Sequence, residues 1–266
     1  MSQSWVVVSG KGGVGKSMVS MGLGVALSKR KMQCCCVDAD IGLRNLDMLM
    51  NMHNKVVYDV LDVARKDCKL KYALIPHAMH ESLLLLPAAQ LGSVEQLDAG
   101  DMERIVKKLK KRVAYVIMDA PAGIGRGVEN LLPAADHTLL VTTPDDVAMR
   151  DAERVISLLE KAGKPRPMLV VNRVIPKMVE AGEMYSPQTV AATLDVPLLG
   201  FVPEDRAVLA AINRHESFMD HECPAEQAME RIAQRFLGEY IPMPAFPQKR
   251  RGLFAWLHRK EQGLEG

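Results

Sequence analysis

Short apolar runs rich in β-branched residues alternate with longer segments of helical periodicity along this chain of 266 residues. The apolar runs predict buried strands at residues 5–8, 33–37, 83–86, 113–119, 137–141, 168–171 and 198–202. The segments between them predict helices at 18–29, 56–66, 101–112, 146–161, 206–213 and 224–237. Alternation of this kind predicts an α/β fold, in which a mostly parallel sheet carries helices on both faces. No repeat and no internal linker interrupts it, so we expect one domain over residues 1–240.

A glycine-rich loop joins the first predicted strand to the first predicted helix. Gly10, four further residues and then Gly15-Lys16-Ser17 have the spacing of a phosphate-binding loop. Such a loop wraps backbone N–H groups around a phosphate, and the helix dipole favours the negative charge. A chance glycine turn is the alternative, but the strand and the helix stand where the mechanism needs them. We therefore predict a nucleotide-binding segment made of Lys11, Gly12, Gly13, Val14, Gly15, Lys16, Ser17 and Met18.

Within this loop, Lys16 is expected to reach the β- and γ-phosphates of the nucleotide, and the Ser17 hydroxyl to bind Mg²⁺. Carboxylates follow two other strands. Asp38 and Asp40 come after the second strand, and Asp119 ends the fourth in the manner of a Walker B strand. Ligands bind at the carboxyl ends of strands in open α/β sheets, where carboxylates can hold a metal or orient water. We predict Ser17, Asp38 and Asp119 as metal ligands, with aspartates that merely cap helices as the alternative.

The lysine that follows Gly10 gives the loop a second cation. The run Lys-Gly-Gly-Val-Gly-Lys-Ser at 11–17 resembles the deviant Walker A loop of the MinD/ParA family of ATPases, and residues 38–47 and 119–123 resemble the MinD members. The resemblance implies ATP and Mg²⁺ as cofactors and a homodimer that encloses the nucleotides. In that dimer Lys11 would reach the partner's phosphates, and Asp40 would position the hydrolytic water. The expected catalytic residues are Asp40, Lys11 and Lys16; a solvated surface lysine is the alternative for Lys11.

The same resemblance implies contacts with the adenine. Asn172 and Arg173 follow the strand at 168–171, and Pro203 and Glu204 follow the strand at 198–202. In the family, an asparagine at this strand end reads the adenine edge and the neighbouring arginine packs near the base. A simple strand-end cap is the alternative for the Asn-Arg pair. The glycine-rich segment 120–125 is expected to act as a switch that senses the γ-phosphate.

The C-terminal end departs from the composition of the body. Three prolines in residues 241–248 predict an extended tether, and residues 249–266 predict an amphipathic basic tail. Basic flanks beside aromatic and leucine side chains on one helical face are typical of an interfacial membrane anchor, as in MinD proteins. The residues expected at the membrane are Arg250, Arg251, Leu253, Phe254, Trp256 and Leu257. A helix docked on the body and a calmodulin-like or nucleic-acid-binding tail are the alternatives.

Charge and cysteine content narrow the function classes. A net charge of +2 gives no general basic coat for nucleic acid, and we expect the basic face of residues 101–112 to be solvated. The adjacent Cys34, Cys35 and Cys36 fall in a predicted strand, which indicates buried reduced thiols. No signal peptide and no apolar stretch of about 20 residues is visible. We expect a cytoplasmic protein that is peripheral on the inner face of the cell membrane when ATP is bound.

Taken together, the resemblance implies an ATP-hydrolysing switch that positions the division septum. It would recruit a MinC-type division inhibitor to an anionic membrane surface, with a MinE-type activator as a further partner and no specific nucleic acid. A flagellar-number regulator of the FlhG type and a DNA-partition ATPase of the ParA type are the alternatives. A DNA-partition protein needs a basic patch on the folded body, and its DNA affinity should fall steeply with salt.

Overall fold

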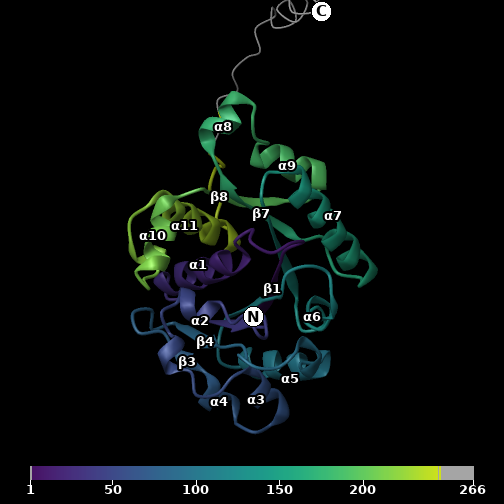
Figure 1. The fold of residues 1–266 in the computed structure, drawn as a ribbon, viewed down its shortest axis with the longest axis vertical. Helices are drawn as coiled ribbons and strands as arrows, with labels where there is room; N and C mark the ends of the chain where they lie inside the picture. The colour runs from purple at the N-terminus through teal and green to yellow at the C-terminus, as the bar shows by residue number, and fades with distance from the viewer. Residues whose placement is uncertain (1, 245, 247–266) are drawn as a thin grey trace, which may run out of the picture.

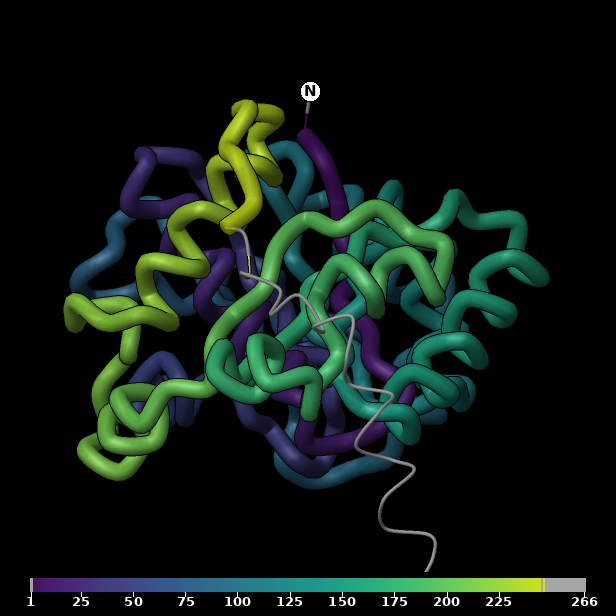
Figure 2. Tube along the Cα trace, turned by 90° about the horizontal axis from the view of Figure 1, so that it is seen from above, coloured from purple at the N-terminus to yellow at the C-terminus, as the bar shows by residue number. Residues whose placement is uncertain are grey.

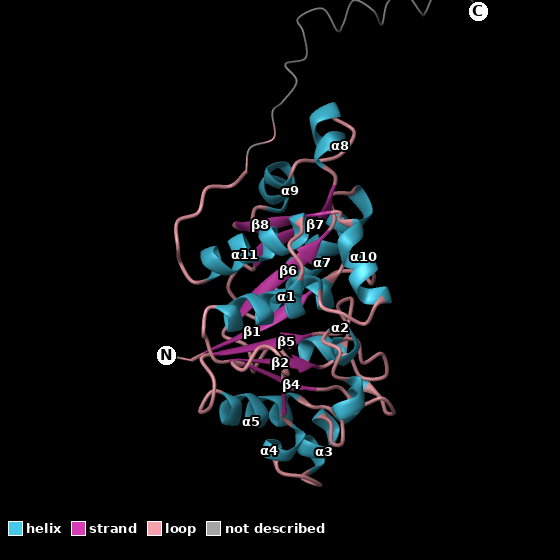
Figure 3. Ribbon diagram, turned by 90° about the vertical axis from the view of Figure 1, so that its left-hand side faces the viewer, coloured by secondary structure: helices cyan, strands magenta, loops and turns pink. Residues whose placement is uncertain are grey.

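An eight-stranded sheet forms the centre of the computed structural model, which describes residues 2–244 and 246. The strand order is β3-β4-β2-β5-β1-β6-β7-β8, and only the short edge strand β3 is antiparallel (Figures 1 and 3). The strands are β1 Gln3–Val8, β2 Cys34–Asp38, β3 Ile75–Pro76, β4 Leu83–Leu86, β5 Tyr115–Asp119, β6 His137–Thr142, β7 Met168–Val174 and β8 Leu198–Pro203. The predicted α/β class is therefore confirmed.

Helices cover both faces of the sheet (Figure 3). They are α1 Lys16–Lys29, α2 Leu46–Leu49, α3 Val60–Arg65, α4 Leu70–Ala73, α5 Ala99–Leu109, α6 Arg126–Glu129, α7 Asp146–Lys161, α8 Pro176–Ala181, α9 Pro187–Leu194, α10 Arg206–Asn213 and α11 Pro224–Phe236. Short 3-10 turns lie at His53–Lys55, Val94–Gln96 and Phe218–Asp220. In Figure 2 the purple N-terminal strand passes through the middle of the molecule, between the helical layers.

Several element boundaries differ from the prediction by a few residues, and two of these differences bear on helix capping and on the candidate site. The helix expected from residue 56 begins at Val60, because the Asp59 side chain accepts hydrogen bonds from two first-turn amides and caps the helix there. Strand β7 runs on to Val174, so Asn172 and Arg173 lie inside the strand and not beyond its end. Several short elements were not predicted, among them β3 and α9, although the Ser186 cap and Pro187 marked the start of α9.

The sheet has a separate apolar core on each face. Strand β2 illustrates the alternation, since Cys35 faces one core and Cys34 and Cys36 face the other. All three thiols are free and fully buried, as expected, and burial raises the pKa of Cys34 to about 12. These cysteines therefore act as small apolar side chains.

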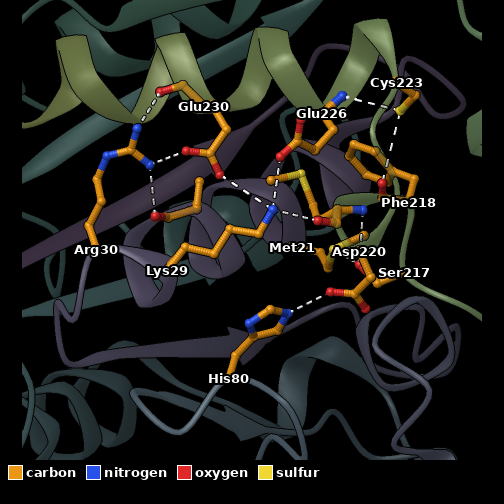
Figure 4. A network of polar contacts seen from close by, with 12 residues as sticks. Met21, Lys29, Arg30, His80, Ser217, Phe218, Asp220, Cys223, Glu226 and Glu230 are labelled. Carbon is orange, nitrogen blue, oxygen red and sulfur yellow. Dashed lines mark hydrogen bonds and ion pairs between the residues drawn. The ribbon is translucent and has the colours of Figure 1, made fainter.

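Ion pairs fasten the end of α1 to α11 (Figure 4). Lys29 Nζ lies 2.8 Å from Glu226 Oε1 and also donates to the carbonyl oxygen of Met219 at 2.6 Å. Arg30 pairs with Glu230, and both side chains are about one-fifth exposed. Because α1 starts at the glycine-rich loop and α11 is the last helix of the described chain, these pairs connect the loop's helix to the C-terminal end of the body.

The described part of the expected tether lies against the body. Arg235 donates from Nε to the carbonyl of Ile241 at 2.7 Å and from Nη2 to that of Pro242 at 2.8 Å. The ring of Phe246 lies 5.1 Å from that of Phe201 in β8. The membrane residues expected at 250–257 lie outside the described residues. Within the described part of the chain, no helix has the length and apolar character to cross a bilayer.

The packing of α1 on β2 supplies a stability test. A Cβ at Gly24 would lie 2.5 Å from Cys36 Sγ and 3.2 Å from Leu83 Cδ1, so Gly24→Ala overfills the core. Overpacking costs about 1–3 kcal/mol, which exceeds the gain of about 1 kcal/mol in helix propensity. We expect a lower midpoint of urea unfolding for the nucleotide-free protein. The matched control is Gly100→Ala in α5, where the nearest atom is 3.5 Å away; this variant should be neutral or stabilised, and equal midpoints for both would contradict the packing argument.

Candidate functional site

The glycine-rich loop leaves the carboxyl end of β1 and passes between α7 and β7. A Cβ at Gly10 would lie 2.3 Å from the backbone carbonyl of Asp151 in α7, a contact that backbone atoms cannot relieve by rotating. Gly15 has a φ of +89° and stands against Asn172, whose Nδ2 would lie 2.1 Å from an added Cβ. Both positions therefore require glycine.

The start of α1 is left without a side-chain cap, because its N-cap residue is Gly15. The first-turn N–H groups of a helix need partners from outside the helix, and the dipole makes this end attractive to anions. A hollow of about 410 Å³ adjoins the loop and is lined by Lys11, Gly12, Gly13, Val14, Thr143, Pro144, Asp145, Arg173 and Met184. The loop thus presents backbone donors beside an open space.

Lys16 and Asp119 form a buried ion pair at the start of α1. Lys16 Nζ lies 2.9 Å from Asp119 Oδ1, with 6% of the lysine side chain and none of the aspartate exposed. The Ser20 hydroxyl donates to the same oxygen at 2.8 Å, whereas the buried Asp119 Oδ2 has no hydrogen-bond partner. Lys16 Nζ is also 3.5 Å from Ser17 Oγ. The predicted Mg²⁺ ligands Ser17 and Asp119 are thus brought together, and one carboxylate oxygen is available.

Asp38 shapes the loop that follows β2. Its Oδ1 accepts from the amide of Asp40 and its Oδ2 from the amide of Leu46, both at 3.0 Å. Asp38 is paired in register with Asp119 on the neighbouring strand β5. Burial, reinforced by the negative charge of Asp119, raises the pKa of Asp38 to about 7.

Asp40 lies near the same group and is 8% exposed. Burial raises the pKa of Asp40; the charge of Lys16 lowers it, and that of Asp119 raises it further. All three carboxyl groups thus lie near enough to the Lys16 ammonium for its charge to act on them, and a bound divalent cation would favour their ionised forms. Among the described residues, no three His, Cys, Asp or Glu side chains converge to hold a metal by themselves. The unpartnered Oδ2 of Asp119 fits Mg²⁺, which takes one or two protein carboxylates and completes its shell with phosphates and water.

Lys11 contacts an acidic residue of its own chain. Its Nζ lies 3.4 Å from Asp145 Oδ1, and the two side chains are 36% and 48% exposed. Asp145 also caps α7 by accepting from the amide of Ala148 at 2.9 Å. Asp145 was not predicted, because this pairing joins positions 134 residues apart and leaves no local signal in the sequence. The expected reach of Lys11 into a partner subunit stays a prediction.

The residues expected at the adenine fall into two groups. Asn172 is 3% exposed, and its Nδ2 donates to the carbonyl of Val14 at 2.7 Å, so the amide supports the phosphate loop from beneath. Arg173 and Glu204 form an exposed pair, with Nε 2.7 Å from Oε2, next to Pro203 at the end of β8. The hydrogen bond and charge of Glu204 raise the pKa of Arg173. The adenine contacts themselves stay predictions.

Comparison with known proteins identifies the family. The family model that matches is ParA, described as NUBPL iron-transfer P-loop NTPase, and it covers residues 1–237. A septum site-determining protein MinD from Bacillus subtilis is 39% identical over 258 residues, 96% of each chain. The chain belongs to the MinD/ParA family of P-loop NTPases. This family assignment confirms the resemblance found in the loop and switch sequences.

Other MinD proteins match this chain in sequence and in structure. A putative MinD from Guillardia theta is 43% identical over 216 residues, which cover 81% of this chain and 80% of that one. The MinD chain of an Aquifex aeolicus MinC:MinD complex superimposes with a TM-score of 0.85 at 36% identity, over 92% of this chain and 100% of the other. A Pyrococcus horikoshii MinD complexed with Mg-ADP gives 0.79 at 28% identity, over 89% and 96%.

The raised pKa of Asp38 predicts how stability depends on pH. The folded protein keeps this proton to about pH 7, whereas an unfolded aspartate releases it near its ordinary value of about 3.8. The folded state therefore binds more protons over that range, so stability falls as pH rises through it and levels off above. One pKa unit corresponds to about 1.4 kcal/mol. The loss of the Asp38 proton should therefore lower the free energy of unfolding of the nucleotide-free protein by about 2 kcal/mol between pH 5.5 and pH 8.

Urea unfolding at both pH values, with Asp38→Asn as the comparison, measures this effect. An asparagine side chain cannot accept both backbone hydrogen bonds, so the variant should be less stable at each pH. Its stability should nevertheless change little between the two pH values, because the titrating carboxyl group is gone. An unchanged fall in the variant would show that another group titrates.

Proposed function

We propose that this chain is an ATP-hydrolysing switch of the MinD type that takes part in placing the division septum. The observation that carries the proposal is the uncapped start of α1 behind a glycine loop, with Lys16 buried against Asp119 and a second lysine at position 11. The relatives named septum site-determining proteins match the chain over almost its full length. The flagellar-number and DNA-partition alternatives are not favoured by these relatives.

The chemistry proposed is phosphoryl transfer from ATP to water. The backbone donors at the start of α1 and the Lys16 ammonium would hold the phosphates, so Lys16 must exchange part of its contact with Asp119 for phosphate oxygens. Ser17 and Asp119 would hold Mg²⁺, which neutralises phosphate charge when bound. Asp38 keeps the loop carrying Asp40 in place, and Asp40, with its raised pKa, would orient the attacking water.

A solved relative supports one of the proposed partners, and the family resemblance implies the others. The Aquifex aeolicus protein forms a MinC:MinD complex, and we propose that this chain likewise recruits a MinC-type inhibitor. An ATP-bound homodimer would place Lys11 at the partner's phosphates and present two basic tails to an anionic membrane surface. Each basic residue near such a surface contributes about 1 kcal/mol, and a second tail on the same dimer adds about 100-fold or more through effective concentration. The protein would be cytoplasmic and peripheral on the inner membrane face, with a MinE-type activator as a further partner.

Two lysine variants test the phosphate chemistry. Lys16→Ala should lose productive ATP binding and lower kcat/KM at least about 100-fold, because it removes the cation at the transferred phosphate. Lys11→Ala should still bind nucleotide but fail to hydrolyse it, which fluorescent-nucleotide titration and phosphate release measure separately. Lys31→Ala, an exposed lysine beyond the end of α1, is the control. Turnover equal to that of the unmodified protein in either site variant would remove the role assigned to that lysine.

Membrane coupling is tested by co-sedimentation with anionic liposomes. The full chain and a chain ending at Gln248 are compared with ATP, with ADP and without nucleotide. Binding should need both ATP and the tail, because a single tail binds weakly and the dimer supplies two. Equal binding in all nucleotide states would make the tail a simple anchor. An absence of binding would favour the DNA-partition alternative, which salt-dependent DNA binding then tests.

A further inference from the structure

A basic hollow of about 700 Å³ lies between α3, α4 and α5, away from the glycine loop. We propose that this basic hollow binds a compact anion that carries several phosphate groups. The hollow shares no residue with the site at α1, and the inference does not depend on the proposed ATPase activity. Figure 1 shows α3, α4 and α5 at one end of the molecule and α8 at the other.

The walls of the hollow are held in place by packing and by Arg104. The apolar sides of α3 and α5 belong to the same core. Arg104 of α5 donates from Nη2 to the carbonyl of Ala64 at 2.7 Å, at the end of α3, and also pairs with Asp101. Val63 and Leu70 contribute buried apolar surface to the lining. The hollow is therefore part of the rigid body and needs no rearrangement to exist.

Cations line the hollow from two sides. Lys66, Lys69 and Lys71 come from the segment that joins α3 to α4 and from α4 itself. Lys108, Lys111 and Arg112 come from the last turn of α5 and the residues after it, and the lining contains no acidic side chain. The exposed basic face expected from the sequence of 101–112 is thus one wall of a cationic cavity.

Few of these charges are neutralised within the chain. Among the residues that the structure describes, Lys66, Lys69, Lys108, Lys111 and Arg112 have no carboxylate within ion-pair distance. Burial is the main cause that raises the pKa of the Cys68 thiol, and the charges of Asp62, Asp59 and Asp67 raise it further. Asp59 and Asp62 are hydrogen-bonded within the capping box of α3. Like charges held close together repel one another, and a bound anion would relieve that repulsion.

Shape and charge together decide the ligand class. Lysine ammonium groups bind phosphate as point charges from any direction, and a concave wall lets several reach one small ligand. A single phosphate would engage only a few of these side chains. A flat membrane or a long duplex would touch the rim and leave the interior unfilled. A compact polyphosphate, either free or as a lipid headgroup, uses the whole lining.

The test uses the full chain saturated with MgADP, so that the glycine loop is occupied, and inorganic tripolyphosphate as the probe. Isothermal titration calorimetry should give saturable binding that weakens as salt rises. The variant Lys108→Gln/Lys111→Gln should bind about tenfold more weakly or worse, because it removes two charge-assisted contacts. The control Lys107→Gln/Lys31→Gln makes the same change in net charge at exposed sites outside the hollow, and its affinity should change less than about twofold.

A second arm separates the two sources of phosphate. The same proteins are sedimented under MgADP with phosphatidylcholine vesicles that contain phosphatidylinositol bisphosphate, whose headgroup carries several phosphates, and with pure phosphatidylcholine vesicles. A loss of binding to the phosphatidylinositol bisphosphate vesicles in the hollow variant alone, without tripolyphosphate binding, would assign the hollow to a lipid headgroup. Binding of tripolyphosphate alone would assign it to a free anion.

Three results would overturn the proposal. They are an absence of saturable binding in both arms, equal losses in the hollow variant and its control, and duplex DNA binding that only the hollow variant loses while neither phosphate probe binds. Unchanged thermal unfolding of both variants confirms that the comparison is between folded proteins.

Discussion

The candidate site depends on how negative charge is balanced where three strands end. Asp38 and Asp119 are register partners on adjacent parallel strands, so the sheet itself brings these carboxyl groups together. Lys16 is the buried cation that faces them, and removing one member of a buried ion pair costs about 3–5 kcal/mol. The loop, the start of α1 and the segment after β2 are all arranged around this cluster. Nucleotide and Mg²⁺ would rebalance charge that the fold has already concentrated.

The parts of the site that are local in sequence were predictable. The glycine loop, its lysines and the aspartates at strand ends are recognisable because spacing and strand polarity alone place them. The same logic gave the α/β class and most of the longer elements. Short elements such as β3 were missed because a pair of residues carries no periodicity, and their existence depends on the neighbouring strand.

Contacts between distant segments were not predictable from patterns. The support of Val14 by Asn172 and the pairing of Lys11 with Asp145 each join residues more than one hundred positions apart. The lysines of residues 101–112 are a second case in which contacts between distant segments could not be predicted. Their exposure followed from the amphipathic pattern, but only the folded chain shows that α4 and the end of α3 turn that face into a cavity. A sequence pattern predicts which face of a helix is apolar and which is polar, but tertiary packing determines which faces together line a cavity.

The ion pairs between α1 and α11 have an evolutionary consequence. Arg30 and Glu230 stand 200 positions apart and form an ion pair; Glu230 also lies 3.6 Å from Lys29, which pairs with Glu226. A substitution that reverses one sign leaves two like charges face to face at the junction between the helix behind the loop and the helix that leads to the C-terminal segment. Among descendants of this protein, the two helices should therefore change in pairs, so that mutations tolerated at one depend on the residues already fixed at the other.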